Sequence, residues 1–318
     1  MDPKAALIFI INATSGHNDP TETRQAIEAA LKTAGRPAEF WSASPDELTR
    51  VAQKAATMAK SRRSAVIAVG GDGTINAVAQ AAHQQGCVMG VVPQGTFNYF
   101  ARAHGLPSGA HEATQSLLDS GPLPVQVGVI NDRVFLVNAS LGLYPDLLED
   151  REAYKARFGR SRLVAFMSTV MTLLGKHRQL KLRIELGGIS RDITTPTVFV
   201  GNNRLQLEQV GLPEARALDE GCIAAVMLRP IGSLAMLWLL LRGSFGKLGE
   251  EDTVESFKFH RMVIKPRQAW RGHRVKVAYD GEVSWMSAPL EFRVAPQPLY
   301  LLKPSAAGVQ PEADTVGP

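Results

Sequence analysis

The sequence has few cysteines and no long hydrophobic segment. Only Cys87 and Cys222 occur among 318 residues, each in an apolar stretch, and there is no CxxC pair or Cys/His spacing typical of zinc. We therefore expect buried free thiols in a reducing compartment rather than a disulfide or a structural zinc. The longest apolar run, residues 231–241, is far short of the roughly 20 residues that span a bilayer.

Several other signals are also missing. The first residues lack the length and the cleavage site of a secretory signal, so we expect a cytoplasmic protein and leave open peripheral contact with the inner membrane face. Aromatic residues make up only 7%, and no nucleic-acid-binding motif accompanies the net charge of +5. No GxSxG or HExxH motif is present, which gives no support to a hydrolase or a zinc protease. The basic balance suits an anionic partner such as a nucleotide, an acidic lipid or nucleic acid, and the low aromatic content and the missing motif make nucleic acid the least favoured of the three.

The chain is organised around residues 64–76, SAVIAVGGDGTIN. Residues 64–69 form an apolar run typical of a buried parallel strand, and residues 75–85 have helical spacing. The glycine-rich turn between them, residues 70–74, indicates a phosphate site, because backbone N–H groups and the helix dipole stabilise an anion there. The turn matches neither the Walker nor the Rossmann pattern. Asp72 within it suggests a nucleotide bound with a metal, whereas a tight turn without ligand is the alternative.

The surrounding residues predict an α/β domain. Strands are expected at 5–11, 38–42, 64–69 and 87–92, and helices at 19–34, 44–60, 75–85 and 97–104. Ser44 is expected to cap the second helix. Strands that alternate with helices indicate a parallel sheet with helices on both faces. The polar loops 12–16, 70–74 and 93–96 then meet at the carboxyl edge of that sheet, where ligands bind.

The pattern changes near residue 122. Asn131-Asp132 predicts a hairpin, and further strands are expected at 180–186, 193–200, 222–228, 253–259, 261–265, 273–279 and 290–294. Many strands with short turns predict an antiparallel sandwich. We therefore expect a nucleotide-binding domain at 1–124, to which a strand near 297–304 returns, a β-sandwich at 125–296 and a disordered tail at 305–318. Residues 144–174 are basic and are predicted to be helical.

These motifs resemble the catalytic-domain family of diacylglycerol kinases, which includes bacterial lipid kinases and sphingosine kinases. The resemblance rests on GGDGTIN at 70–76 and GTFNYFAR at 95–102, followed in the family's order by NASLG at 138–142, GNN at 201–203, LDEG at 218–221 and DGE at 280–282. It covers nearly the whole chain. It implies an α/β nucleotide-binding domain with a parallel sheet followed by a mainly antiparallel β-sandwich, with the active site in the cleft between them.

The resemblance also implies roles for particular residues. Those that would bind ATP are Gly70, Gly71, Asp72, Gly73, Thr74, Ile75, Asn76 and Thr96, with Ser42 as the hydroxyl that precedes the second helix. Ala217 and Cys222 would hold a structural magnesium ion through their carbonyls, and Glu220 through its carboxylate. Asp280 matches the catalytic carboxylate.

The chain departs from the family's motifs at two positions. Tyr99 replaces an acid of the GTxND pattern, and Glu220 stands where relatives have aspartate. Asp280-Gly281 is also a good hairpin turn by itself, so a structural role for Asp280 stays open. Residues 234–247 fit a membrane-docking helix and equally a helix packed on the sandwich.

The sequence thus predicts an ATP- and Mg²⁺-dependent lipid kinase. It would transfer the γ-phosphate to a hydroxyl of a diacylglycerol-like or long-chain-base lipid. One alternative is an NAD-kinase-like enzyme. The other is a catalytically weakened protein that binds a nucleotide or a lipid, which Tyr99 and Glu220 favour.

Overall fold

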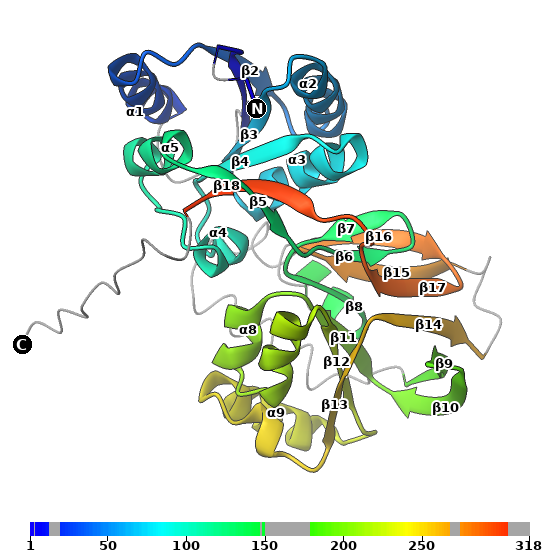
Figure 1. Cartoon of the computed structure of the whole chain (residues 1–318). Helices are drawn as coiled ribbons and strands as arrows, with labels where there is room; N and C mark the ends of the chain where they lie inside the picture. The colour runs from blue at the N-terminus through cyan, green and yellow to red at the C-terminus, as the bar shows by residue number, and fades with distance from the viewer. Residues whose placement is uncertain (3, 13–19, 147, 150–178, 268–273, 305–318) are drawn as a thin grey trace, which may run out of the picture. The chain divides into compact units, whose positions relative to one another are not determined.

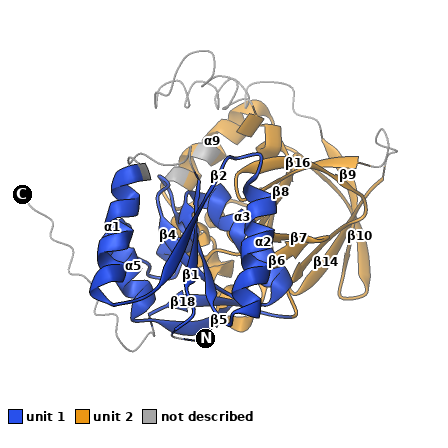
Figure 2. Cartoon of the chain, turned by 90° about the horizontal axis from the view of Figure 1, so that it is seen from above, with its two compact units in different colours: residues 1–125, 297–318 blue, residues 126–296 orange. Residues whose placement is uncertain are grey.

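The structure is a computed structural model that describes residues 1–2, 4–12, 20–146, 148–149, 179–267 and 274–304. The chain divides into two compact units, residues 1–125 with 297–318 and residues 126–296 (Figure 2). The elements of the first unit are β1 (Leu7–Asn12), α1 (Pro20–Thr33), β2 (Ala38–Ala43), α2 (Leu48–Ser61), β3 (Ala65–Gly70), α3 (Asp72–Gln85), β4 (Val88–Pro93), α4 (Tyr99–Ala103), α5 (Ala110–Leu118), β5 (Gly121–Val125) and β18 (Leu299–Lys303).

The first unit is an α/β layer structure with one six-stranded sheet in the order β2-β1-β3-β4-β18-β5. Neighbouring strands from β2 to β18 are parallel, and β5 runs antiparallel to β18 (Figure 1). The strands β1 and β3 are buried along their whole length, because helices cover both faces of a parallel sheet. The chain passes from β1 to β2 on one side of β1, and then returns to form β3 on the other side. The strand order therefore reverses between β1 and β3. Such a reversal opens a crevice at the carboxyl ends of the two strands.

Helix boundaries differ from the sequence expectation at three places in this unit. Helix α3 begins at Asp72, so Asp72 and Gly73 lie in its first turn rather than in a loop before it. Helix α2 begins at Leu48, after a turn in which Glu47 N donates to Ser44 O. The prediction that Ser44 caps this helix is wrong, because its hydroxyl bonds the Glu47 carboxylate instead. The expected helix 97–104 is shortened to α4, since Asn98 before it has a left-handed backbone.

The described part of the second unit consists mainly of strands. Its elements are β6 (Gly128–Ile130), β7 (Arg133–Phe135), β8 (Asn138–Gly142), β9 (Leu180–Leu186), β10 (Ile189–Thr195), β11 (Thr197–Gly201), α8 (Arg204–Gln209), η1 (Pro213–Glu220), β12 (Ile223–Leu228), α9 (Ser233–Ser244), η2 (Leu248–Glu250), β13 (Val254–Phe259), β14 (Arg261–Pro266), β15 (Arg274–Tyr279), β16 (Glu282–Ser287) and β17 (Leu290–Val294). The strands form two six-stranded sheets, β10-β9-β14-β17-β6-β7 and β13-β12-β11-β8-β15-β16. Within each sheet the paired strands are antiparallel.

The core of this unit lies between the two sheets. Inward side chains of both sheets form one buried cluster that includes Phe135, Leu182, Val200 and Phe292. Strand β9 shows the reason, because Leu180, Leu182 and Ile184 alternate with outward Lys181 and Arg183. The predicted class, a parallel α/β domain followed by a mainly antiparallel sandwich, is confirmed.

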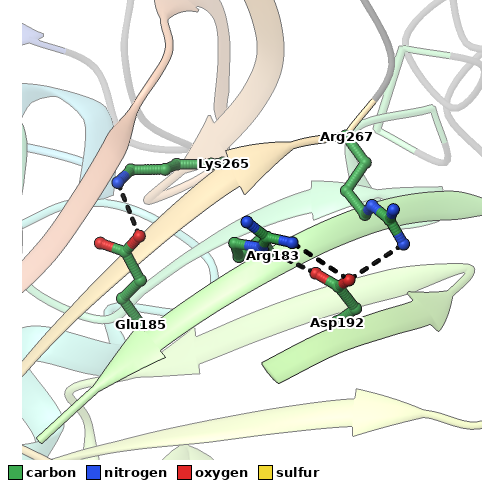
Figure 3. Close-up of polar contacts among 5 residues, drawn as sticks. All are labelled: Arg183, Glu185, Asp192, Lys265 and Arg267. Atoms are coloured by element: carbon green, nitrogen blue, oxygen red, sulfur yellow. Dashed lines mark hydrogen bonds and ion pairs between the residues drawn. The ribbon is translucent and has the colours of Figure 1, made fainter. Parts of the chain in front are cut away.

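Charged side chains on the outer face of the sheet that contains β9 form ion pairs (Figure 3). Asp192 of β10 pairs with Arg183 of β9 and with Arg267 after β14, each at 2.9 Å. Lys265 of β14 pairs with Glu185 of β9 at 2.6 Å. These exposed pairs contribute little stability, but they show that this face is solvated.

The predicted hairpin at Asn131-Asp132 is confirmed by the antiparallel pair β6–β7. The single strand expected at 193–200 is wrong, since it is the end of β10 and most of β11, with Pro196 between them. The sequence also missed strands β8 and β16. Most of the helical prediction for 144–174 and all of the disordered-tail prediction lie outside the described residues. Within the parts of the chain that the structure describes, no helix is both long enough and apolar enough to cross a membrane.

Candidate functional site

Three strands of the first unit end at the carboxyl edge of its sheet with polar or glycine residues. Asn12 ends β1, Gly70 ends β3, and Gln94 directly follows β4. The side-chain amide of Asn12 donates to Thr74 Oγ1 at 3.2 Å, and Gln94 N donates to Gly70 O at 2.9 Å. These bonds fix the start of α3 in the crevice between β1 and β3.

The glycines at this edge allow backbone segments to approach closely. A Cβ on Gly70 would lie 2.5 Å from Thr74 Oγ1, and a Cβ on Gly95 would lie 2.9 Å from the Gly71 Cα atom. None of Gly70, Gly71, Gly73 and Gly95 has a positive φ. Close packing of the turn, and not an unusual backbone conformation, therefore requires glycine at Gly70 and Gly95.

Asn98 closes the loop that follows β4. Its Oδ1 accepts from Gly95 N at 2.9 Å and its Nδ2 donates to Gly95 O at 2.8 Å. Its φ of 47° is in the left-handed region, which asparagine tolerates better than most residues. The backbone N–H groups of Asn98 and Tyr99 then point at the carboxylate of Asp72 and hydrogen-bond it.

The Asp72 carboxylate is the electrostatic centre of this edge. Burial raises its pKa above the usual value, and the hydrogen bonds from Asn98 N and Tyr99 N oppose that shift. Its Oδ1 is buried and has no hydrogen-bond partner among the described residues. The first turn of α3 also leaves N–H groups without intrahelical acceptors, where the helix dipole stabilises negative charge. A buried acceptor atom without a donor, beside an anion-binding helix start, fits a metal-bound phosphate.

The other residues predicted to bind the nucleotide lie at different distances from the Asp72 carboxylate. Thr96 is exposed in the loop that Asn98 closes, while Ile75 and Asn76 are buried in α3. Ser42 is exposed near the end of β2, opposite Ile11 of β1. Because β1 separates β2 from β3, Ser42 is about 10 Å from the glycine turn across the sheet. The structure thus brings together residues 70–76 and 96 and leaves Ser42 at the same edge but apart.

In the second unit, Asp280 lies in the tight turn between β15 and β16, with φ of 45°. Its buried carboxylate accepts three backbone hydrogen bonds, from Leu136 N at 2.7 Å, Val137 N at 2.8 Å and Asn138 N at 3.0 Å. Three N–H donors stabilise the ionised carboxylate. They also orient it rigidly against the segment that leads into β8.

A polar connection leads from Asp280 to an apolar cavity in the same unit. Asn138, which donates its N–H to Asp280, donates its side-chain amide to Gln206 Oε1 at 3.0 Å. Gln206 of α8 lines a cavity of about 460 Å³ whose other walls come from β11, β12 and α9, with Phe199, Val226 and Met236 among them. The cavity is therefore apolar with a polar group at Gln206, and two hydrogen bonds connect Gln206 to a buried carboxylate.

The residues predicted to hold a structural magnesium ion all contact other protein groups in this structure. The Glu220 carboxylate is ion-paired with the ammonium group of Lys258 on β13. Ala217 O accepts from Cys222 N at 3.0 Å, and Cys222 O accepts from Gln126 Nε2 at 3.0 Å. Each predicted ligand thus already has a protein partner, and a cation stands at the carboxylate. Among the described residues, no group of three or more His, Cys, Asp or Glu side chains could hold a metal.

Sequence reasoning placed Asn12 only within the polar loop 12–16, and it missed Asn98 and Gln206. Asn98 could have been found as an asparagine just after the Gly95-Thr96 turn, because asparagine adopts the left-handed conformation more readily than most residues. Gln206 gave no signal in the sequence, because only folding brings it next to Asn138.

The chain is similar to known proteins over different parts of its length. Residues 6–130 match the model of the diacylglycerol kinase catalytic domain. The chain is 27% identical over 322 residues to a Pseudomonas aeruginosa protein named "Probable lipid kinase YegS-like", covering 96% of this chain and 97% of that protein. It is 27% identical over 168 residues to a diacylglycerol kinase of Staphylococcus carnosus, covering 52% and 54% of the two chains.

The first curated relatives are matched over only 33% to 54% of their length. A crystal structure of a diacylglycerol kinase from Bacillus anthracis superposes with a TM-score of 0.68 at 19% identity, covering 96% of this chain and 98% of the other. At that identity the likeness shows the fold alone.

Proposed function

We propose that this chain, whose residues 6–130 match the model of the diacylglycerol kinase catalytic domain, is an ATP- and Mg²⁺-dependent kinase for a lipid hydroxyl. The acceptor is a diacylglycerol-like or long-chain-base lipid. The observation that carries this proposal is the buried Asp72 Oδ1, which has no partner among the described residues and lies at the start of α3.

The first unit supplies the donor site. The N–H groups in the first turn of α3 would bind phosphate oxygens. Glycine at positions 71 and 95 lets this turn and the loop after β4 approach each other closely. Asp72 and the loop at Thr96 would orient the nucleotide. A bound Mg²⁺ ion would neutralise charge that develops on the phosphates during transfer. Tyr99 donates its backbone N–H to Asp72. This hydrogen bond does not depend on the side chain at position 99, where the GTxND pattern has an acid.

The second unit supplies the acceptor site. The apolar cavity under α9 matches the size range of small-molecule sites, and hydrocarbon chains are its natural occupants. In this proposal the lipid hydroxyl lies at the polar side of the cavity, near Gln206. Asp280 then accepts the proton of the hydroxyl as the phosphoryl group transfers. An apolar cavity favours a lipid over NAD as the acceptor, because NAD is polar and charged.

Radiolabel transfer from ATP tests the proposal. We expect Mg²⁺-dependent labelling of diacylglycerol or of a long-chain base, and none of NAD. Labelling of NAD alone would identify the alternative enzyme, and ATP binding without labelling of any lipid would identify a binding protein.

Asp280 needs a matched structural control, because its carboxylate also anchors residues 136–138. Asn202 anchors the same segment through its side chain, which donates to Leu136 O at 3.2 Å. Asp280→Asn should lower turnover by ~10²–10⁴-fold while ATP affinity persists. Asn202→Ala should loosen the segment and lower thermal stability without such a loss of turnover. Equal turnover losses in the two variants would leave Asp280 with only a structural role.

A further inference from the structure

Helix α9 has apolar side chains on two opposite faces. Met236 and Leu239 are buried and line the cavity together with Gly243. The other face is exposed, with 77% of Leu234 and 56% of Trp238 accessible to solvent, and it continues through Leu241 to Phe245 at the helix end. These four positions are separated by four, three and four residues, so they form one stripe along the helix. We call them the α9 stripe.

The α9 stripe differs from ordinary exposed hydrophobic residues. Single exposed apolar side chains are normal on protein surfaces, whereas a contiguous group marks an interaction site. In the same unit, Ile189 at the start of β10 and Trp285 on β16 are the other large apolar residues with high exposure among the described ones. They lie on separate strands, whereas the stripe places four such side chains on a single helix.

We propose that the α9 stripe docks onto the surface of a lipid bilayer, so that α9 forms the wall between the membrane and the cavity. The proposal rests on the proposed function, since an acceptor lipid has to leave a membrane to enter the cavity that the inner face of α9 lines. A helix of 12 residues is about 18 Å long, which is too short to span the hydrocarbon core of about 30 Å. It would therefore lie in the interface.

The charges around the helix favour an anionic bilayer. Residues 229–249 contain no acidic residue but include Arg229, Arg242 and Lys247, and the acidic residues 250–252 directly follow them. Arg242 is ion-paired with Glu250 and Glu251, whereas the side chains of Arg229 and Lys247 are exposed at opposite ends of the segment. Basic residues flanking an apolar stripe that contains tryptophan are typical of helices that bind the membrane interface.

Vesicle sedimentation without ATP tests the docking surface. The probe is a vesicle of phosphatidylcholine and phosphatidylglycerol, and the full-length protein is compared with Leu234→Gln and Trp238→Gln. The matched controls are Ile189→Gln and Trp285→Gln, whose parent side chains are 74% and 52% exposed. We expect each stripe variant to bind about tenfold more weakly and the controls to bind like the parent. Brominated lipids should quench the parent's tryptophan fluorescence more than that of Trp238→Phe.

Kinase assays separate this inference from the proposed function. Phosphorylation of a short-chain acceptor in solution should be unchanged in Leu234→Gln and Trp238→Gln, because neither residue lines the cavity. If no lipid is phosphorylated but vesicle binding still depends on the stripe, the proposed function fails and the docking surface stands. Parental vesicle binding by both stripe variants would overturn the docking surface. A parent dimer that the stripe variants convert to monomers, with no binding to vesicles, would also overturn it.

Discussion

At the scale of single residues, the burial of the Asp72 carboxylate suits the proposed binding of a metal-bound phosphate but lowers the stability of the fold. Its carboxylate is buried enough that its pKa is raised, although Asn98 N and Tyr99 N donate to it. The native state therefore binds a proton at this carboxyl more tightly than the unfolded chain does. Stability from this group falls as the pH rises from the ordinary aspartate value through the raised one.

Replacing Asp72 with asparagine should therefore separate stability from function. At neutral pH the melting temperature of Asp72→Asn should exceed that of the parent, and the difference should shrink as the pH falls through the acidic range. Phosphoryl transfer should decrease by about a hundredfold or more. Thermal unfolding curves across pH check the first expectation. A variant less stable than the parent at pH 7 would contradict it.

The ion pair between Glu220 and Lys258 leads to a second prediction. Because the ammonium group already neutralises Glu220, adding Mg²⁺ or a chelator in the absence of nucleotide should leave the melting temperature unchanged. Lys258→Met should change the melting temperature little, since both side chains are largely exposed to solvent. A Mg²⁺-dependent increase that Glu220→Gln abolishes would instead show that the ion binds there.

At the scale of elements, α9 connects the cavity to the surface. Gly243 faces the cavity, and a Cβ there would have only ordinary contact, 3.9 Å from Leu248 Cδ1. The Cβ of a residue introduced here therefore meets no clash, and leucine is also a better helix former than glycine. The added side chain would occupy the volume in which we place the hydrocarbon chain.

Gly243→Leu should thus be stable but impaired with long acceptors. We expect kcat/KM for a long-chain lipid to fall about tenfold or more relative to a short-chain lipid. Gly232→Leu, at the other end of the same helix and outside the cavity lining, is the control and should leave that ratio unchanged. If Gly243→Leu has the parental preference for chain length, the hydrocarbon chain lies elsewhere.

At the scale of the whole molecule, the two kinds of site lie in units with separate hydrophobic cores. Hydrogen exchange should report each ligand in its own unit. ATP with Mg²⁺ should slow amide exchange in residues 70–76 and 95–99, and a short-chain acceptor should slow it in 199–212 and 226–243. At a ligand concentration of about 100 times Kd, amides that exchange only from the unliganded form should slow by about a hundredfold. An acceptor that protects only the strands of the parallel sheet would contradict the placement of its site.

The sequence by itself determined the fold class and the kind of chemistry at the glycine turn. Buried strands followed by capped helices, and later short strands separated by turns, are local patterns that hydrophobic periodicity reveals. The density of glycine around Asp72 is equally local. Helix α3 nevertheless begins three residues earlier than its apolar spacing indicates, because glycines and an aspartate carry no periodic signal even where they are helical.

Only the tertiary structure decided which polar groups are satisfied and which are not. The three donors to Asp280 come from residues more than 140 positions away, and the bond from Asn138 to Gln206 spans 68. The pairing of Lys258 with Glu220 depends on a strand that lies beside η1 only after folding. The spacing along α9 could not say which of its apolar side chains are buried, because an all-apolar helix gives no preferred face. In the folded unit, the face with Met236 and Leu239 is buried along the cavity, and the α9 stripe stays exposed.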